Sequence, residues 1–527
     1  MFLKKNTTKE VLIIIGISIY AFYVNWISGN IGVIPIDSFG FLDTGYSILN
    51  GKLPIRDFWI FTGLVVDYME AGFIYIFGNN WNSHLIHSSF MNILATYIFY
   101  IFFKEFELEK KYLTIYCLSF ATLCYPVSGT PFAYLHSYIF SLIAIMFFIL
   151  AIKNGKKTTW FALPFIAFLA FFSMQTPSAF ILLILFFALA TNFYYKKKIK
   201  NFNFFIFGCL STSIIFFLFL FITKTELINF VYQYILFPLS IGEGRVASSE
   251  VAYVSLIDQL NLKRLFGDFK FIHILFIPLI IFTIKNLKKK NAILNLLNLT
   301  FIFSILGFLF NQLITANQIY IFSLIPIIGA LLHLNINQLN IDPRSCFLIL
   351  FVVLFSTVKF HFRYNIDRKF HDLENIDKSK AINANLIHKS FKNLKWISKF
   401  EDPENEMKTL ILALKEIKND SREKTLITHY HFFSTFLDQN LNILNRWYLW
   451  DNNTHPTENH KYFHVYKNLV NKNIKSNNVK VIYLLGHENE ILFKNVKNYF
   501  TDYCFKSKTL VDKRFSSHEI VNCKKIK

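Results

Sequence analysis

Acidic residues are concentrated in one early stretch of the chain, residues 34–78, directly after the first long apolar segment. A carboxylate can take a proton from a hydroxyl group while a new bond forms at that oxygen, which is general base catalysis. Carboxylates at the rim of a membrane bundle are costly to desolvate, so they point to a functional site. A loop whose charges simply face water explains the composition equally well. The acidic residues of this stretch are Asp37, Asp43, Asp57, Asp67 and Glu70.

A second polar stretch, residues 224–270, carries groups suited to phosphate. An Arg side chain presents a planar fork that matches phosphate oxygens, whereas Lys acts as a point charge. The segment Gly242–Arg245 predicts a turn that displays Arg245, and Lys263 and Arg264 follow it. A solvated Arg on a surface turn is the simpler alternative.

Histidine pairs and cofactor motifs give weaker signals. His429 and His431 share one face of a probable strand, but no Cys or carboxylate lies near them in the sequence, so they make a poor metal site. His136 lies in the short loop after the third apolar segment, where a lone His is more often structural than catalytic. Phosphate-binding loops, dinucleotide-binding turns, CxxC pairs and HExxH motifs are absent. We therefore predict no cofactor, and the sequence gives no support for a divalent metal.

Long apolar segments must hold these polar stretches in place. The chain is 54% hydrophobic and contains 63 Phe residues, and its apolar runs recur up to residue 360. A run of about 18 or more apolar residues is long enough to cross a bilayer. The pattern predicts an α-helical polytopic membrane protein with about 11 transmembrane helices. We expect spans near residues 11–28, 84–103, 112–127, 134–152, 159–173, 177–195, 203–223, 270–284, 291–314, 317–334 and 345–359.

Lysine clusters set the expected orientation of these spans. Lys-rich turns follow spans two, four, six and eight, whereas the other connecting segments are poorer in Lys and Arg. Because cytoplasmic loops carry the excess of positive charge, we expect a cytoplasmic N-terminus and outer loops at residues 29–83 and 224–270. An odd number of spans places the C-terminal domain outside as well. The net charge of +21 is dispersed between apolar runs and forms no single patch, so no nucleic acid partner is expected.

The polar C-terminal part divides into a connector, residues 361–403, and a soluble α/β domain, residues 404–527. Helical and strand-like segments alternate in this domain, which favours a largely parallel sheet. Residues 445–460 are rich in Trp, Asn and His and are expected to face a ligand or the membrane, with a structural Trp-rich turn as the alternative. Cys504 and Cys523 flank two probable strands. They would form a disulfide in an oxidising compartment, or remain two unpaired thiols.

Four short segments of the acidic stretch occur in a characteristic order: Asp43–Tyr46, Asn50–Asp57, Thr62–Leu64 and Phe77–Gly78. Together they resemble the first outer loop of the GT-C superfamily of membrane glycosyltransferases, in the branch that uses polyprenyl-phosphate sugars. The layout of many spans before an outer domain is also similar. Thr44 stands where the family has the second acid of an Asp-Glu pair, and Thr62 and Gly63 stand where it has two prolines. An Arg common early in the second span is replaced by His84 and His87 nearby.

The resemblance implies an enzyme at the outer face of a bacterial plasma membrane. It would move a sugar from a polyprenyl-phosphate donor to a hydroxyl of a glycan, lipid or protein, with inversion at the anomeric carbon. Such a displacement needs a carboxylate base and cationic groups that stabilise the leaving phosphate. Asp43 matches the family position best as the base, and Asp37 is its rival. The residues expected to bind substrate are Arg245, Tyr46, Asp57, Arg56, His136, Lys263 and Arg264.

Two other classes of protein fit a polytopic chain: a transporter or flippase, and a cell-envelope polysaccharide assembly protein without catalytic activity. Transporters tend to carry inverted repeats and interrupted helices with polar groups at the middle of the membrane. The sequence shows no such repeat, and its carboxylates cluster outside the spans. An enzyme is therefore the favoured interpretation.

Overall fold

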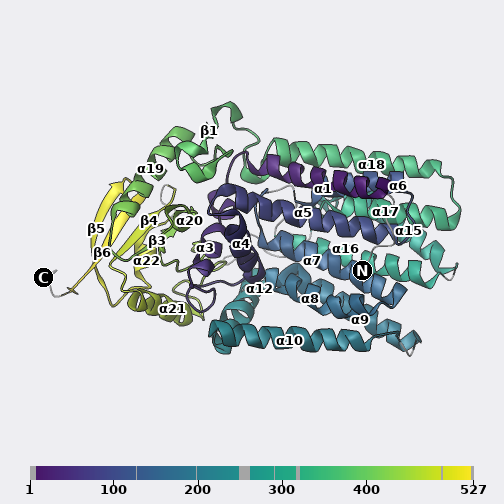
Figure 1. The fold of residues 1–527 in the computed structure, drawn as a ribbon, viewed down its shortest axis with the longest axis horizontal. Helices are drawn as coiled ribbons and strands as arrows, with labels where there is room; N and C mark the ends of the chain where they lie inside the picture. The colour runs from purple at the N-terminus through teal and green to yellow at the C-terminus, as the bar shows by residue number, and fades with distance from the viewer. Residues whose placement is uncertain are drawn as a thin grey trace.

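The computed structural model describes residues 8–125, 128–196, 199–247, 261–289, 291–315, 321–487 and 491–523. The protein is mostly helical and has a small sheet near its C-terminus. Long helices that lie side by side form one end of the molecule, and the sheet with its flanking helices forms the other (Figure 1). The predicted order of a helical bundle followed by a small α/β region is confirmed at this level.

Each predicted apolar segment corresponds to a helix of the bundle. Within the described ranges, eight of these helices are long and apolar enough to cross a membrane, and two further ones, α8 and α17, are apolar but shorter. The bundle consists of α1 (Thr8–Gly29), α5 (Trp81–Lys104), α6 (Lys110–Cys124), α7 (Ala133–Asn154), α8 (Lys157–Ser173), α9 (Gln175–Lys196), α10 (Asn203–Thr223), α15 (Lys270–Leu287), α16 (Ala292–Ile314), α17 (Leu324–Leu339) and α18 (Arg344–His361).

Side-chain exposure on the bundle fits a lipid environment. α10 exposes a row of large apolar side chains, and Phe221 near its end is 82% exposed. Soluble monomers rarely expose contiguous apolar surface of this extent. α7, in contrast, is buried along nearly its whole length. A helix satisfies its own backbone hydrogen bonds and can therefore lie in lipid. These helices are candidate membrane spans, and together they suggest a multi-pass membrane protein.

The lysine-rich turns in the described ranges lie at the end of the bundle that is remote from the sheet (Figure 1). Lys104, at the end of α5, forms an ion pair with Glu10 at the start of α1. Lys153, near the end of α7, donates a hydrogen bond to the Glu105 carbonyl. Lys289, after α15, donates to a carbonyl near the end of α17 at 3.1 Å. The basic turns therefore gather at one end of the bundle, as the sequence predicts.

The two polar stretches fold at the opposite end, beside the sheet. The predicted turn at Gly242–Arg245 is wrong, because a helix continues through it. Phe237 and Ile241 are buried one helical turn apart, and their packing outweighs the low helix propensity of the glycines. The first stretch contains α2 (Pro35–Ser38), α3 (Leu42–Leu49) and α4 (Leu64–Phe77). The second contains α11 (Leu227–Phe230), the π-helix η1 (Val231–Leu236), α12 (Phe237–Ala247) and α14 (Leu262–Asp268).

The connector is built from short turns, and the soluble domain from longer elements. The connector contains η2 (Phe362–Ile366), η3 (Lys369–His371), η4 (Lys378–Lys380), β1 (Ile382–Asn383), η5 (Ala384–Leu386), η6 (Lys389–Phe391) and β2 (Lys395–Trp396). The soluble domain contains α19 (Pro403–Asn419), β3 (Lys424–Thr428), α20 (Phe433–Leu437), α21 (Phe463–Ser476), β4 (Val481–Leu485), α22 (Phe493–Lys497), β5 (Cys504–Val511) and β6 (Phe515–Val521).

The sheet of the soluble domain has the strand order β3-β4-β6-β5. Only β3 and β4 are parallel, whereas β6 is antiparallel to both β4 and β5. The predicted largely parallel sheet is therefore wrong. β5 and β6 are joined by the short turn at residues 512–514, and strands joined so tightly must be antiparallel. Cys504 and Cys523 form a disulfide with their Cα atoms 5.1 Å apart, which confirms the predicted pairing.

An aromatic cluster joins the first polar stretch to the soluble part of the chain. The Phe39 ring stacks on Trp396 with centroids 5.7 Å apart and meets Phe432 edge-on at 5.1 Å. Trp81, at the start of α5, and Phe391 complete the cluster around Phe39. All five side chains are buried in one apolar core. The first loop and the soluble domain are therefore packed as a single unit, which fixes the position of α2 and α3.

Candidate functional site

Asp37 lies on α2, the short helix that begins at Pro35. Its side chain is half-buried, and no described residue donates a hydrogen bond to its carboxylate. Burial raises the pKa of Asp37 to about 6, against the opposing charges of His429 and Lys399. A carboxylate of this kind is a stronger base than an ordinary Asp and is still largely ionised near neutral pH. Asp37 therefore has the properties of a general base.

The soluble domain lies directly against α2. Trp447 donates its Nε1–H to the Ile36 carbonyl at 2.8 Å. His429, which follows β3, has its Nε2 3.1 Å from the Tyr448 carbonyl, so this nitrogen carries a proton. The charge interaction between Asp37 and His429 connects the first loop to the end of β3. The candidate base is thus at the junction of the bundle and the soluble domain, and both parts surround it.

Asp43, on α3, is buried and already has three hydrogen-bond donors. Its Oδ1 accepts bonds from the Thr435 backbone N–H at 2.8 Å and from the Thr435 hydroxyl at 2.7 Å, and its Oδ2 accepts one from the Ser434 N–H at 3.2 Å. Asp43 therefore satisfies the first N–H groups of α20, a helix of the other domain. Burial raises the pKa of Asp43 to about 6, and the bonds from Thr435 oppose that shift. This geometry gives Asp43 a structural role at the domain interface.

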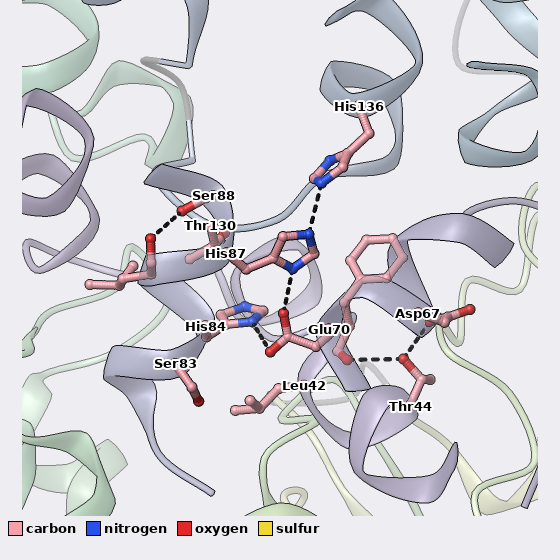
Figure 2. Close-up of polar contacts among 12 residues, drawn as sticks. Leu42, Thr44, Asp67, Glu70, Ser83, His84, His87, Ser88, Thr130 and His136 are labelled. Carbon is pink, nitrogen blue, oxygen red and sulfur yellow. Dashed lines mark hydrogen bonds and ion pairs between the residues drawn. The ribbon is translucent and has the colours of Figure 1, made fainter. Parts of the chain in front are cut away.

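A buried ion pair ties α4 to the soluble domain. Arg446 donates hydrogen bonds to Asp67 Oδ2 and, at 2.7 Å, to the Thr62 carbonyl. The Thr44 hydroxyl donates to Asp67 Oδ1 at 2.6 Å (Figure 2). The guanidinium carbon lies 4.3 Å from the centre of the Phe41 ring. Burial raises the pKa of Asp67 to about 6, and the charge of Arg446 opposes this shift. Asp67 is fully occupied by these partners, which makes it a structural group.

A chain of hydrogen-bonded side chains runs from α4 into the bundle (Figure 2). Glu70 accepts or shares protons with His84 Nδ1 at 2.8 Å and His87 Nδ1 at 2.7 Å. His87 Nε2 lies 3.0 Å from His136 Nε2 on α7. All four side chains are buried. Burial alone would raise the pKa of Glu70, but the charge of His84 and the bonds from both histidines outweigh it and lower the pKa to about 2. Glu70 is therefore a carboxylate that holds two imidazoles.

The other predicted residues whose contacts the structure describes have partners other than Asp37. Tyr46 donates its hydroxyl proton to Asp438 at 2.9 Å, again across the domain interface. Arg56 and Asp57 pair with each other at 2.6 Å. Lys263 is exposed on α14. The side chains of Arg245 and Arg264 lie outside the described part of the structure, so the predicted phosphate site is tested by neither.

The sequence did not identify three groups that the structure brings to this region: Arg446, His429 as a neighbour of Asp37, and the histidine partners of Glu70. Arg446 lies in the Trp-rich segment that the sequence marks as unusual, but spacing alone does not reveal a partner so far away. His84 and His87 share one helix face because they are three residues apart, and that was the available signal for a common partner.

The bundle also contains an apolar cavity. A cavity of about 660 Å³ lies among α7, α8, α9 and α10, and its lining is dominated by Phe and Leu side chains without any charged group. No group of three or more His, Cys, Asp or Glu residues in the described ranges is arranged to hold a metal ion. The region around Asp37 is thus the place where a base is available, and the cavity is a place where an apolar chain fits.

No family model matches this chain, and no curated protein matches its sequence.

Proposed function

We propose that this chain is a membrane glycosyltransferase that uses Asp37 as its general base. The observation that carries this proposal is the state of Asp37, a half-buried carboxylate of raised pKa with no described hydrogen-bond donor. General base catalysis contributes about 10²- to 10⁴-fold to a rate. The resemblance of the first loop to the GT-C superfamily supports the same reaction. In that resemblance Asp43 matches the position of the base. Because the Asp43 carboxylate already accepts hydrogen bonds from Thr435 of α20, we assign the base to Asp37 instead.

The proposed reaction is an inverting displacement at the anomeric carbon of the sugar. The acceptor hydroxyl attacks this carbon while Asp37 takes the hydroxyl proton. The bond from the carbon to the phosphate oxygen breaks, and its electron pair leaves with the phosphate. Negative charge grows on the phosphate as the bond breaks, so a nearby cation lowers the barrier. Lys399, whose charge acts on Asp37, is one such cation, and Arg245, Lys263 and Arg264 are proposed as further ones.

The proposed donor is a sugar on a polyprenyl phosphate. The sequence contains no nucleotide-binding motif, which disfavours a nucleotide sugar. The cavity among α7 to α10 is lined almost entirely by apolar side chains, and such a surface suits a lipid chain better than a polar ligand. We propose a glycan, lipid or protein hydroxyl as the acceptor.

We propose that the reaction takes place at the outer face of a bacterial plasma membrane, with the N-terminus in the cytoplasm. The lysine-rich turns lie at the end of the bundle away from Asp37, and such turns are typical of the cytoplasmic side. The disulfide between Cys504 and Cys523 suits an oxidising outer compartment.

The test uses the full-length protein purified into lipid. It is supplied with an acceptor glycan and either a polyprenyl-phosphate sugar or the matching nucleotide sugar. We expect transfer from the lipid form only, and a loss of about 10²-fold or more in Asp37→Asn. Asp342→Asn is the matched control. This exposed Asp, in the turn between α17 and α18 at the lysine-rich end, should tolerate the same change without loss.

Two results would overturn the proposal. Transfer from the nucleotide sugar alone would remove the lipid-linked donor. Full activity of Asp37→Asn with the lipid-linked donor would remove the base assignment while leaving the transferase reaction in place.

A further inference from the structure

The buried chain of Glu70, His84, His87 and His136 (Figure 2) ends at the Ser38 carbonyl on one side and at Tyr125 and Phe132 on the other. His84 Nε2 lies 3.0 Å from the Ser38 carbonyl, which only accepts, so this nitrogen carries a proton. His84 and Glu70 share one proton between Nδ1 and Oε1 across 2.8 Å, so the two side chains together form a neutral pair.

The other end of the chain offers His136 Nδ1 two alternative partners. The Phe132 carbonyl lies 2.9 Å from this nitrogen and can only accept a hydrogen bond. The Tyr125 hydroxyl lies 3.1 Å from it and can donate one, while it accepts the Phe132 backbone N–H at 3.1 Å. A hydrogen bond to the Phe132 carbonyl requires a proton on this nitrogen, whereas a hydrogen bond donated by Tyr125 requires that the nitrogen has none. The protonation of His136 Nδ1 therefore sets the direction of the hydrogen bond between His136 and His87.

In the first arrangement Tyr125 donates to His136 Nδ1. His136 Nε2 then carries its proton and donates to His87 Nε2 across 3.0 Å. His87 Nδ1 donates to Glu70 Oε2 across 2.7 Å. His87 and His136 are both neutral, and the chain from Glu70 to Tyr125 has no net charge once His84 is included.

In the second arrangement the chain holds one more proton. His136 Nδ1 carries a proton and donates to the Phe132 carbonyl, so His136 Nε2 becomes an acceptor. His87 donates from both nitrogens, to His136 Nε2 and to Glu70 Oε2, and is an imidazolium. One hydrogen bond, from Tyr125 to His136, is exchanged for another, from His136 to Phe132. The number of hydrogen bonds is the same in both arrangements.

We propose that the His87–His136 pair, held between Glu70 and Tyr125, is a proton-binding site of the bundle that takes up one proton by reversing its hydrogen bonds. A buried charge normally costs free energy because it loses water. Here Glu70 lies 2.7 Å from the ring that becomes charged, and the Phe73 ring stacks on His87 with centroids 4.7 Å apart, where its π face attracts positive charge. The site stands whether or not the protein transfers a sugar.

The other charged and titratable groups that face this chain are few. Asp67 lies one helical turn before Glu70 on α4 and is neutralised by Arg446 from the soluble domain. Cys124 lies beside Tyr125 at the end of α6 and is buried. α3 faces Glu70 with Gly45, whose lack of a side chain lets the two helices approach closely. Among the described residues, the protonation of the site is therefore governed by Glu70, the three histidines and Tyr125.

The experiment follows the ring nitrogens of isotope-labelled histidine by NMR in the full-length protein in lipid. Their chemical shifts distinguish protonated from unprotonated nitrogen. On acidification from about pH 8 to about pH 4 we expect one histidine to exchange its Nε2 proton for an Nδ1 proton while a second becomes doubly protonated. This coupled change would be the signature of the reversal.

Tyr125→Phe is the decisive variant. It removes the hydroxyl that favours the arrangement with fewer protons, so the midpoint of proton uptake should rise by about one pH unit, a tenfold gain in proton affinity. Tyr138→Phe is the matched control, because it deletes a buried hydroxyl that bonds Ser323 at 2.8 Å and not the chain. Glu70→Gln should shift the midpoint in the opposite direction. Equal midpoints in Tyr125→Phe and Tyr138→Phe, or no coupled change in the parent protein, would overturn the proposal.

Discussion

Replacing Asp43 by Asn separates a structural carboxylate from a catalytic one. The Asn amide group has one oxygen and one NH2 group in place of two carboxylate oxygens. If the oxygen stays with Thr435, the NH2 group faces the Ser434 N–H, and two donors oppose each other. A buried N–H without a partner costs about 1–3 kcal/mol. The two bonds to Thr435 also weaken, because hydrogen bonds to a neutral acceptor are roughly half as strong as those to a carboxylate.

Together these effects should lower the stability of the domain interface by about 2–4 kcal/mol in Asp43→Asn. The measurement is the thermal unfolding midpoint of the purified protein in detergent, combined with limited proteolysis of the soluble domain. Asp37→Asn is the control. Burial raises the pKa of Asp37, so the neutral Asn should be tolerated and the midpoint should stay level or rise. An Asp43→Asn protein with normal stability and no activity would refute this reasoning, because Asp43 would then act as the base.

Three further predictions concern other parts of the molecule. Arg446→Ala leaves the Asp67 carboxylate buried without its partner, so the thermal unfolding midpoint should drop by the equivalent of about 3–5 kcal/mol, and the double variant with Asp67→Asn should recover much of the loss. Transferase activity should fall tenfold per pH unit below about pH 6, because burial raises the pKa of Asp37 to about 6 and the base must be ionised. A rate that stays level down to about pH 4 would contradict this prediction. A membrane-impermeant thiol reagent applied from outside should label Asn50→Cys and not Lys289→Cys, both of which are exposed, and the reverse pattern would invert the proposed orientation.

The bundle could be predicted from the sequence because lipid imposes a simple rule. A segment in the membrane must satisfy its own backbone, so each long apolar run becomes a helix. α7 and α10 were both predicted in this way, although one is buried and the other faces lipid. Apolar content does not distinguish these two environments. In the soluble domain, the alternation of helical and strand-like segments was also recognised, whereas the sheet order was not, since it depends on how the β5–β6 pair docks on β4.

The candidate site was predicted only in part. The stretch of residues 34–78 was predicted as a candidate functional site, with a solvated loop as the alternative, and the structure places Asp37 at the domain junction. The roles of its carboxylates could not be assigned, because each depends on a partner that is distant in the sequence. Asp43 differs from Asp37 by its contact with α20, and Asp67 differs by its contact with Arg446. Spacing within one loop carries no information about such partners.

The long separation between these partners has a consequence for the synthesis of the chain. Asp43 and Asp67 are made early, but their partners follow 392 and 379 positions later, at Thr435 and Arg446. Until the last part of the chain has been made and has folded, both carboxylates must stay in water, because a buried charge without its partner costs several kcal/mol. The helices of the bundle can insert one after another during this time. The first loop can pack against the soluble domain only at the end of synthesis. A chain that ends before α20 would therefore have its helices in the membrane, but the site around Asp37 would not form.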